Sequence, residues 1–331
     1  MVKPEPISNH VSVWGEGPIW HQERLLYVDI ESHKILAFTP ATGEEKIWNV
    51  GQRVGTVVPR AQGGLVWAGD DGFFFLNEDT GVSTPIANPE PDLPDNRFND
   101  GKCDPTGRFW AGTIHLKKQP TAALYCLHAD LRVEKKFSPV TNSNGIIWSR
   151  DSGTMFYIDT PSKKIRAFDV DPATSAITHE RVIWDTRADT SVPDGMTIDN
   201  QDRLWIAFCH GAKVVCFDPA TKQSSSRSTS PASKPPPAPS VGLICRIFTS
   251  PPASSPDWKN LSRVVSSSAV QVPQACLRQP LLADLVAGHE IASPVPKKVP
   301  PADQEPALHP HLSPLKEKGA HHLRHRRRAS P

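Results

Sequence analysis

Short apolar strands recur along the first two thirds of the chain, each followed by a polar turn and a second apolar run. Five such pairs occur, at residues 25–38, 64–76, 107–127, 153–170 and 203–218. Alternation with β-branched and aromatic residues predicts strands, and the Gly, Asp, Ser and Lys residues between them suit hairpin turns. Starting from Leu26, successive copies lie 40, 43, 47 and 48 residues apart. Strand pairs at this period predict an all-β fold of β-propeller blades, with a β-sandwich as the alternative.

The composition changes abruptly after residue 222. Residues 223–331 hold 18 of the 34 prolines but only two of the 24 aromatic residues. Such a segment cannot bury enough apolar surface to offset its chain entropy. We therefore predict a propeller domain at 1–222 and a Pro/Ser-rich, mostly disordered tail at 223–331. Because five blades alone leave an open ring, we interpret the tail as an altered reading frame or retained intron that replaces a last blade.

Charge and cysteine content narrow the function classes. A net charge of +2 gives no electrostatic case for nucleic acid or membrane partners. The chain shows neither a secretory signal nor an apolar run long enough to span a bilayer, which predicts a cytoplasmic protein.

The six cysteines lack CxxC spacing and are expected to be reduced. Cys209 and Cys216 flank a predicted hairpin, and a disulfide between them is the alternative. The basic run 321–328 is interpreted as a solvated terminus, and the sequence leaves the oligomeric state open.

A carboxylate or amide stands beside a glycine just ahead of four of the five strand pairs. These are Glu16-Gly17, Asp100-Gly101, Asn144-Gly145 and Asp194-Gly195, while the second repeat carries Gly55-Thr56 instead. A single such pair usually marks a turn. A shared offset in a ring of repeats, however, brings the oxygens together at the axis. Hard oxygen donors of this kind suit Ca²⁺, Mg²⁺ or Mn²⁺, and an oxygen-rich site can also hold Zn²⁺.

Four motifs carry a resemblance to a known family. They are GEGPIW (15–20), RFNDGKCDPTGRFWAGT (97–113), NSNGIIWS (142–149) and VPDGMTID (192–199). Over about residues 10–222 the chain resembles the regucalcin/gluconolactonase family, also called the senescence-marker-protein family. The resemblance implies a six-bladed β-propeller that binds one divalent cation at its axis and hydrolyses sugar lactones. It implies Glu16, Asn144 and Asp194 as metal ligands, Arg97 and Asn99 as substrate contacts, and Asp194 as general base.

The chain departs from the family pattern at one substrate position. Several members place a glutamate where this sequence has Lys117, and His115 is our candidate for a replacement substrate contact, with a mouth-lining or solvent histidine as the alternative. We predict hydrolysis of a sugar lactone that depends on one divalent cation (Ca²⁺, Zn²⁺, Mn²⁺ or Mg²⁺). A cation can polarise the ester and activate water, and a carboxylate can accept the proton. The alternative is a non-catalytic calcium-binding propeller or an inactive truncated product.

Overall fold

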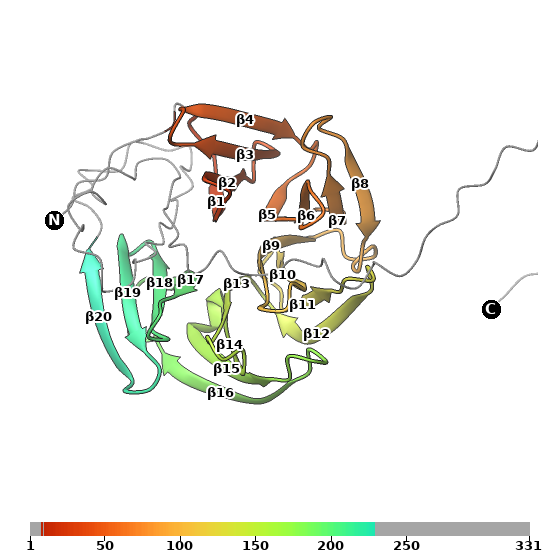
Figure 1. Ribbon diagram of the computed structural model, residues 1–331. Helices are drawn as coiled ribbons and strands as arrows, with labels where there is room; N and C mark the ends of the chain where they lie inside the picture. Colours follow the sequence, from red (N-terminus) through yellow and green to blue (C-terminus); the bar gives the residue numbers. More distant parts are fainter. Residues whose placement is uncertain (1–7, 9, 229–331) are drawn as a thin grey trace, which may run out of the picture. The chain divides into compact units, whose positions relative to one another are not determined.

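A computed structural model describes Ser8 and residues 10–228 of the chain. Within these residues the fold is all-β, with twenty strands and one turn of 3-10 helix, η1 (Thr160–Ser162). The strands form five sheets of four, and in each sheet the strands follow one another in sequence order. Figure 1 shows these five blades arranged about a common centre, with β1, β5, β9, β13 and β17 innermost. None of the helical segments in the described residues is long and apolar enough to cross a bilayer.

The bounds of the strands are as follows. Blade 1 comprises β1 (Gly15–His21), β2 (Arg24–Asp29), β3 (Lys34–Thr39) and β4 (Glu44–Asn49). Blade 2 comprises β5 (Val54–Pro59), β6 (Leu65–Gly69), β7 (Gly72–Leu76) and β8 (Ser83–Ala87). Blade 3 comprises β9 (Asn96–Cys103), β10 (Phe109–His115), β11 (Ala122–Leu127) and β12 (Val133–Val140). Blade 4 comprises β13 (Ser143–Trp148), β14 (Thr154–Asp159), β15 (Lys164–Val170) and β16 (Ile177–Asp185). Blade 5 comprises β17 (Val192–Ile198), β18 (Leu204–Cys209), β19 (Lys213–Asp218) and β20 (Gln223–Ser228).

The predicted strand pairs are confirmed as the second and third strands of each blade. Segment 25–38, for example, spans β2 and β3, and segment 203–218 spans β18 and β19. The propeller interpretation is therefore confirmed for five blades. The outer strand β20 starts at Gln223, directly after the predicted domain boundary, and pairs with β19 along its whole length. The predicted tail beyond Ser228 lies outside the described residues.

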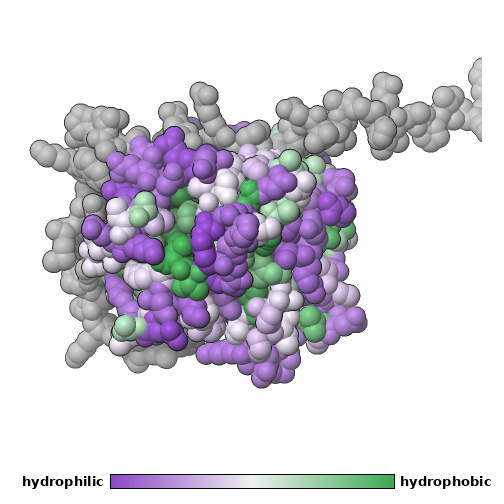
Figure 2. All heavy atoms as spheres, turned by 90° about the horizontal axis from the view of Figure 1, so that it is seen from below, coloured by the Kyte–Doolittle hydropathy of each residue, from purple (hydrophilic) through white to green (hydrophobic). Residues whose placement is uncertain are grey.

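The hydrophobic core lies between neighbouring blades. Val28 and Ile35 of blade 1 pack in one buried cluster with Val57 and Trp67 of blade 2. Equivalent clusters join blades 2 and 3, blades 3 and 4, and blades 4 and 5. A blade cannot bury both of its faces alone, so each one depends on its neighbours for its stability. Figure 2 shows the result on one side of the molecule, where a largely hydrophilic surface is crossed by a narrow apolar strip.

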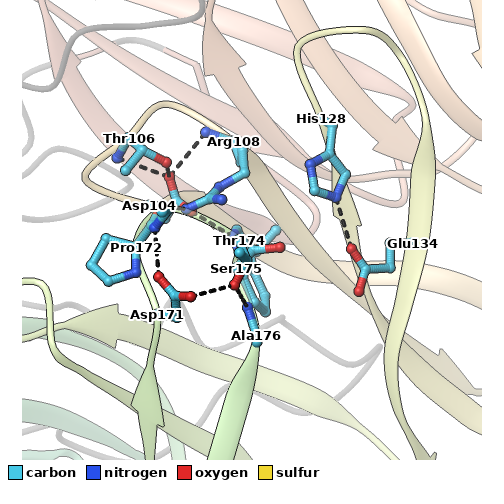
Figure 3. Close-up of polar contacts among 12 residues, drawn as sticks. Asp104, Thr106, Arg108, His128, Glu134, Asp171, Pro172, Thr174, Ser175 and Ala176 are labelled. Carbon is cyan, nitrogen blue, oxygen red and sulfur yellow. Dashed lines mark hydrogen bonds and ion pairs between the residues drawn. The ribbon is translucent and has the colours of Figure 1, made fainter.

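A buried polar clasp joins blades 3 and 4 (Figure 3). Asp104 accepts hydrogen bonds from Arg108 Nε at 2.7 Å and from Trp110 Nε1 at 3.0 Å. The same guanidinium donates from Nη2 to the Pro172 carbonyl oxygen at 2.6 Å, in the turn between β15 and β16. The carboxylate and the guanidinium are both largely buried, so this charge-assisted pair and its bond to the Pro172 carbonyl link the two blades.

A glycine permits the closest approach between blades 2 and 3. We expect Gly55→Ala to lower the free energy of unfolding by about 1–3 kcal/mol, because overpacking against backbone is not relieved by side-chain movement. An added Cβ would lie 2.3 Å from the Phe98 carbonyl oxygen. Urea unfolding of the full chain measures the effect. The control is Gly153→Ala, whose methyl would meet only the Asp151 carboxylate at 3.4 Å and should change stability by less than about 0.5 kcal/mol. Equal losses in both variants would contradict the prediction.

Candidate metal and substrate site

The innermost strand of every blade has an irregularity at a corresponding point. The interrupted stretches are Glu16 to Ile19 in β1, Val54 to Thr56 in β5, Phe98 to Asp100 in β9, Ser143 to Ile146 in β13 and Pro193 to Met196 in β17. A β-bulge adds a residue to one strand and redirects its side chain, and bulges are frequent beside active sites. The phased carboxylate and amide residues of the sequence therefore coincide with a repeated structural feature.

Glycine follows the polar residue where the bulged backbone takes a positive φ, as at Gly17, or leaves no room for a Cβ, as at Gly145. Gly17 in β1 has a positive φ of 57°, a conformation that residues with a Cβ rarely adopt. At Gly145 in β13 an added Cβ would lie 2.7 Å from the Asp194 carbonyl oxygen and 2.9 Å from the Met196 nitrogen. The backbones of β13 and β17 thus touch at the residues next to Asn144 and at Asp194. Two of the three predicted metal ligands are brought onto adjoining strands.

Three carboxylates from alternate blades interact at the centre. The pKa of Glu16 is raised well above its usual value, first because the surrounding protein displaces water and then because of the negative charges of Asp194 and Asp100. Burial also raises the pKa of Asp100 to about 6, although the positive charge of Lys102 opposes the shift. Blades 1, 3 and 5 therefore contribute acidic groups that act on one another across the inner strands.

Asn144 supplies an uncommitted amide to the same region. Its residue surface is only 7% exposed, and its side chain makes no hydrogen bond to another described residue. No three His, Cys, Asp or Glu side chains in the described part of the chain lie close enough together to hold a metal ion. A site on Glu16 and Asp194 would therefore need the amide oxygen of Asn144 as a further donor. The residues fit a hard divalent cation, because all three donors are oxygens.

The predicted substrate contacts Arg97 and Asn99 lie together on β9. Arg97 Nη1 donates to Asn99 Oδ1 at 3.1 Å and to the Phe98 carbonyl oxygen at 2.8 Å. Asn99 Nδ2 in turn donates to the Ser143 carbonyl oxygen of blade 4 at 2.9 Å. Arg97 is only 8% exposed, and its buried Nε has no hydrogen-bond partner in the described structure. Burial, followed by the nearby charge of Arg53, lowers the pKa of the Arg97 guanidinium. A polar ligand could satisfy the unpaired donor.

His115 is placed differently from Arg97. Its cross-strand partner on β9 is Asn96, whereas Arg97 pairs with Ile114. Since adjacent residues of a strand face opposite ways, His115 and Arg97 belong to opposite faces of the sheet. His115 is 8% exposed, and its Nδ1 accepts hydrogen bonds from the backbone nitrogens of Lys117 and Gln119, both at 3.1 Å. The imidazole therefore holds the loop after β10, and a substrate contact by His115 stays a prediction.

Sequence reasoning did not assign a role to three residues of this centre. Asp100 belongs to one of the four phased pairs whose oxygens are expected at the axis, but the sequence assigns it no role as a metal ligand or substrate contact. The sequence gives no indication that Lys102 acts on Asp100 or that Cys209 acts on Glu16, because these pairs come together only in the folded chain. Cys209 pairs with Val192 in the ladder and Cys216 with Trp205, so the two thiols do not face each other. Cys209 and Cys216 are not joined in a disulfide, which contradicts the alternative of a pairing between them.

The raised pKa of Asp100 predicts a pH-dependent stability. The folded pKa of about 6 exceeds the ordinary value of 3.8, so the folded state holds more protons between these limits. The free energy of unfolding should therefore fall as pH rises from about 4 to about 6, by at most about 1.4 kcal/mol per unit from this group.

Asp100→Asn removes this contribution, and its stability relative to the parent protein should increase with pH through the same window. Urea unfolding in EDTA at pH 4, 5, 6 and 7 measures it. Asp95→Asn is the control, because the Asp95 carboxylate is paired with Lys117 at 2.7 Å and its pKa is lowered, so this substitution should give no gain at pH 7. If Asp100→Asn raised the free energy of unfolding by the same amount at every pH, the raised pKa of Asp100 would be refuted.

Known proteins resemble the chain in sequence and in structure. Regucalcin from Xenopus laevis is 38% identical over 229 residues, which cover 66% of this chain and 76% of that protein. Regucalcin from Danio rerio is 37% identical with the same coverage. Among solved structures, a luciferin-regenerating enzyme has a TM-score of 0.62 at 28% identity and covers 66% of this chain and 76% of its own.

Two further findings bear on the family. A crystal structure described as a calcium-binding protein, regucalcin, from Agrobacterium tumefaciens has a TM-score of 0.62 at 26% identity, covering 65% of this chain and 75% of that chain. The family model described as the SMP-30/Gluconolactonase/LRE-like region matches residues 14–238. This match spans well over half of the chain and includes all five blades, so the protein belongs to the SMP-30/gluconolactonase/LRE-like family.

Proposed function

We propose that the protein hydrolyses a sugar lactone in a reaction that depends on one divalent cation. The observation that carries the proposal is the contact between the bulges of β13 and β17, where the backbone at Gly145, next to Asn144, packs against the Asp194 carbonyl oxygen, while the negative charge of Asp194 raises the pKa of Glu16. Neighbouring carboxylates that are partly withdrawn from water repel one another, and a cation or a proton relieves the repulsion. Membership of the gluconolactonase family supports a lactone as the substrate.

Glu16, Asn144 and Asp194 would hold the cation, which we propose to be Ca²⁺, Zn²⁺, Mn²⁺ or Mg²⁺. When bound, a divalent cation supplies Lewis acidity that polarises an ester carbonyl and makes water more acidic. The Asn144 amide carries no charge, so two carboxylates and one amide balance a doubly charged ion. A fourth or fifth donor position stays available for water and substrate.

Asp194 is our candidate for the general base. A carboxylate beside the attacking water can accept its proton on one oxygen as the carbon–oxygen bond forms. Arg97 and Asn99 would hold the sugar hydroxyls, because both present amide or guanidinium donors that are already fixed by protein contacts. Fixed donors place the ester without further loss of side-chain freedom. His115 would contact substrate only through Nε2, since Nδ1 is occupied by its own loop.

A second candidate function is calcium binding without catalysis, or an inactive truncated product. The described residues contain five blades, whereas we expect a six-bladed ring in which the last blade is replaced. A functional site must be held to within about 0.5 Å, and an open ring would hold it less firmly. The resemblance to a structure described as a calcium-binding protein favours retained cation affinity in this case. In either case we propose a cytoplasmic location.

Asp194→Ala tests the catalytic proposal. Acid release from gluconolactone should depend on added Ca²⁺, Mn²⁺, Zn²⁺ or Mg²⁺, disappear in EDTA and fall at least about 100-fold in the variant, because the general base is lost. Titration at constant pH measures the rate. The control is Asp71→Asn, an exposed aspartate in the turn between β6 and β7, which should leave the rate unchanged. Hydrolysis that persists in EDTA and in Asp194→Ala would refute the proposal.

Calorimetric titration separates the two candidate functions. Cation binding with turnover supports the lactonase, and binding without turnover supports a calcium-binding propeller. The absence of both cation binding and turnover supports an inactive product. Asn144→Ala should weaken cation binding about 10-fold or more if its amide is a ligand.

Limited proteolysis tests the domain boundary. We expect a stable fragment that ends close to Ser228, because β20 completes the fifth blade and the following residues are rich in proline and serine. Circular dichroism of the fragment should retain the β signal of the full chain. Rapid degradation of residues 10–228 together with the rest would contradict a self-sufficient five-blade unit.

A further inference from the structure

One lysine connects two blades that are not neighbours. Lys102 lies on the inner strand β9 of blade 3, and its Nζ donates to the Met196 carbonyl oxygen on β17 of blade 5 at 3.1 Å. Blade 4 lies between them in chain order, and its inner strand β13 packs against both β9 and β17. The lysine therefore passes across the inner side of blade 4, where Figure 1 shows the three inner strands side by side.

The bond ends at the structural feature that presents Asp194. The ladder between β17 and β18 is regular up to Pro193 and resumes at Met196, so Asp194 and Gly195 form the bulge. A bulge lacks the regular ladder bonds and depends on other contacts for its shape. Three contacts from blade 4 or blade 3 reach this bulge. Gly145 approaches it closely, the Thr160 hydroxyl donates to the Pro193 carbonyl oxygen at 2.9 Å where the ladder stops, and the Lys102 ammonium bonds to Met196 where the ladder resumes.

The charge of Lys102 suits this position. The acidic groups Glu16, Asp100 and Asp194 act on one another here, and Lys102 offsets the negative charge at Asp100. An ammonium is strongly hydrated, and it is retained in such a place only when carbonyl and carboxylate oxygens replace its water. The contact thus combines a charge-assisted hydrogen bond with compensation of neighbouring carboxylates.

The chain offers a matched comparison. Lys163, in the turn between β14 and β15, also donates from Nζ to a backbone oxygen, that of Asp189 at 2.7 Å. Asp189 lies in the connection between β16 and β17, ahead of the first strand of blade 5. The two lysines therefore make the same kind of bond, but only Lys102 reaches the bulge.

We infer that Lys102 is a positioning residue: its ammonium bonds across the ring to the Met196 carbonyl and thereby fixes the β17 bulge that aims Asp194 at the centre. The effect on metal binding and turnover rests on the proposed function, whereas the effect on the backbone of β17 does not. Lys102 touches neither substrate nor cation in this assignment, and it acts through Asp194.

Backbone hydrogen exchange and cation binding test the inference on the full chain. Lys102→Met removes the donor while keeping much of the side-chain volume, and Lys102→Arg keeps a charged donor. In EDTA, Lys102→Met should speed exchange at residues 194–198 but not in blade 1, and Lys102→Arg should restore protection. Lys163→Met should leave exchange at residues 194–198 unchanged. Calorimetry with Ca²⁺ and Mn²⁺ should show an affinity about 10–100-fold lower in Lys102→Met, the size typical of residues that orient metal ligands.

The kinetic signature separates positioning from general damage. With gluconolactone, Lys102→Met should lower kcat by more than it raises KM, because Arg97 and Asn99 remain in place. Exchange and cation affinity in Lys102→Met that match those of Lys163→Met would overturn the inference. If Lys102→Met does not fold, Lys102→Gln decides by the same measurements, since its shorter neutral side chain cannot reach the carbonyl. If the parent protein hydrolyses no lactone, the proposed function fails, and the exchange data still decide the role of Lys102.

Discussion

Negative charge gathered at the inner strands is the constraint on which the rest of the structure depends. Glu16, Asp100 and Asp194 come from blades 1, 3 and 5, and each one makes ionisation of its neighbours less favourable. In a protein interior such repulsion is weakly screened, so the arrangement needs either protons or cations to persist. Lys102 supplies one positive charge. A single divalent cation would bring the remaining two positive charges, which is consistent with the metal site proposed above.

The fold sustains this arrangement with contacts that lie away from the centre. Apolar residues fill the spaces between blades, as Val57 and Trp67 of blade 2 do against Val28 of blade 1. Burial of such side chains contributes about 25 cal/mol for each Å² of apolar surface. The clasp of Asp104 and Arg108 adds direction, because its hydrogen bonds tolerate little change of angle. The apolar contacts between blades therefore supply the stability that offsets the repulsion among the carboxylates. The inner strands set the positions of these carboxylates.

The sequence predicted some elements well and others not at all, for physical reasons. The second and third strands of each blade are apolar on both faces and stand out, whereas the outer strand β16 is exposed along most of its length and has no such pattern. Glu16, Asn144 and Asp194 stand out because each precedes a glycine at a repeated offset, as Asp100 also does, and the family resemblance then singles out these three as the predicted metal ligands. Lys102 could not be found, since its partner lies 94 residues away and is a backbone oxygen. A backbone acceptor leaves no trace in the side-chain pattern.

The edge of blade 5 shows why contacts inside the ring matter for Asp194. Asp199, Arg203 and Trp205 reproduce the local hydrogen bonds of the clasp in blade 3, with Arg203 Nε donating to Asp199 Oδ2 at 2.8 Å. The Arg108 side chain, capped by the Pro172 carbonyl, is 11% exposed, whereas that of Arg203 is 39% exposed and meets no corresponding carbonyl among the described residues. Blade 5 is thus held to the other described blades from one side. Among the described residues, the contacts that reach the Asp194 bulge from other blades therefore come from blade 4 and from Lys102. A displacement of blade 5 would therefore be transmitted to Asp194 through β17. The bond from the Lys102 ammonium to the Met196 carbonyl would oppose that displacement.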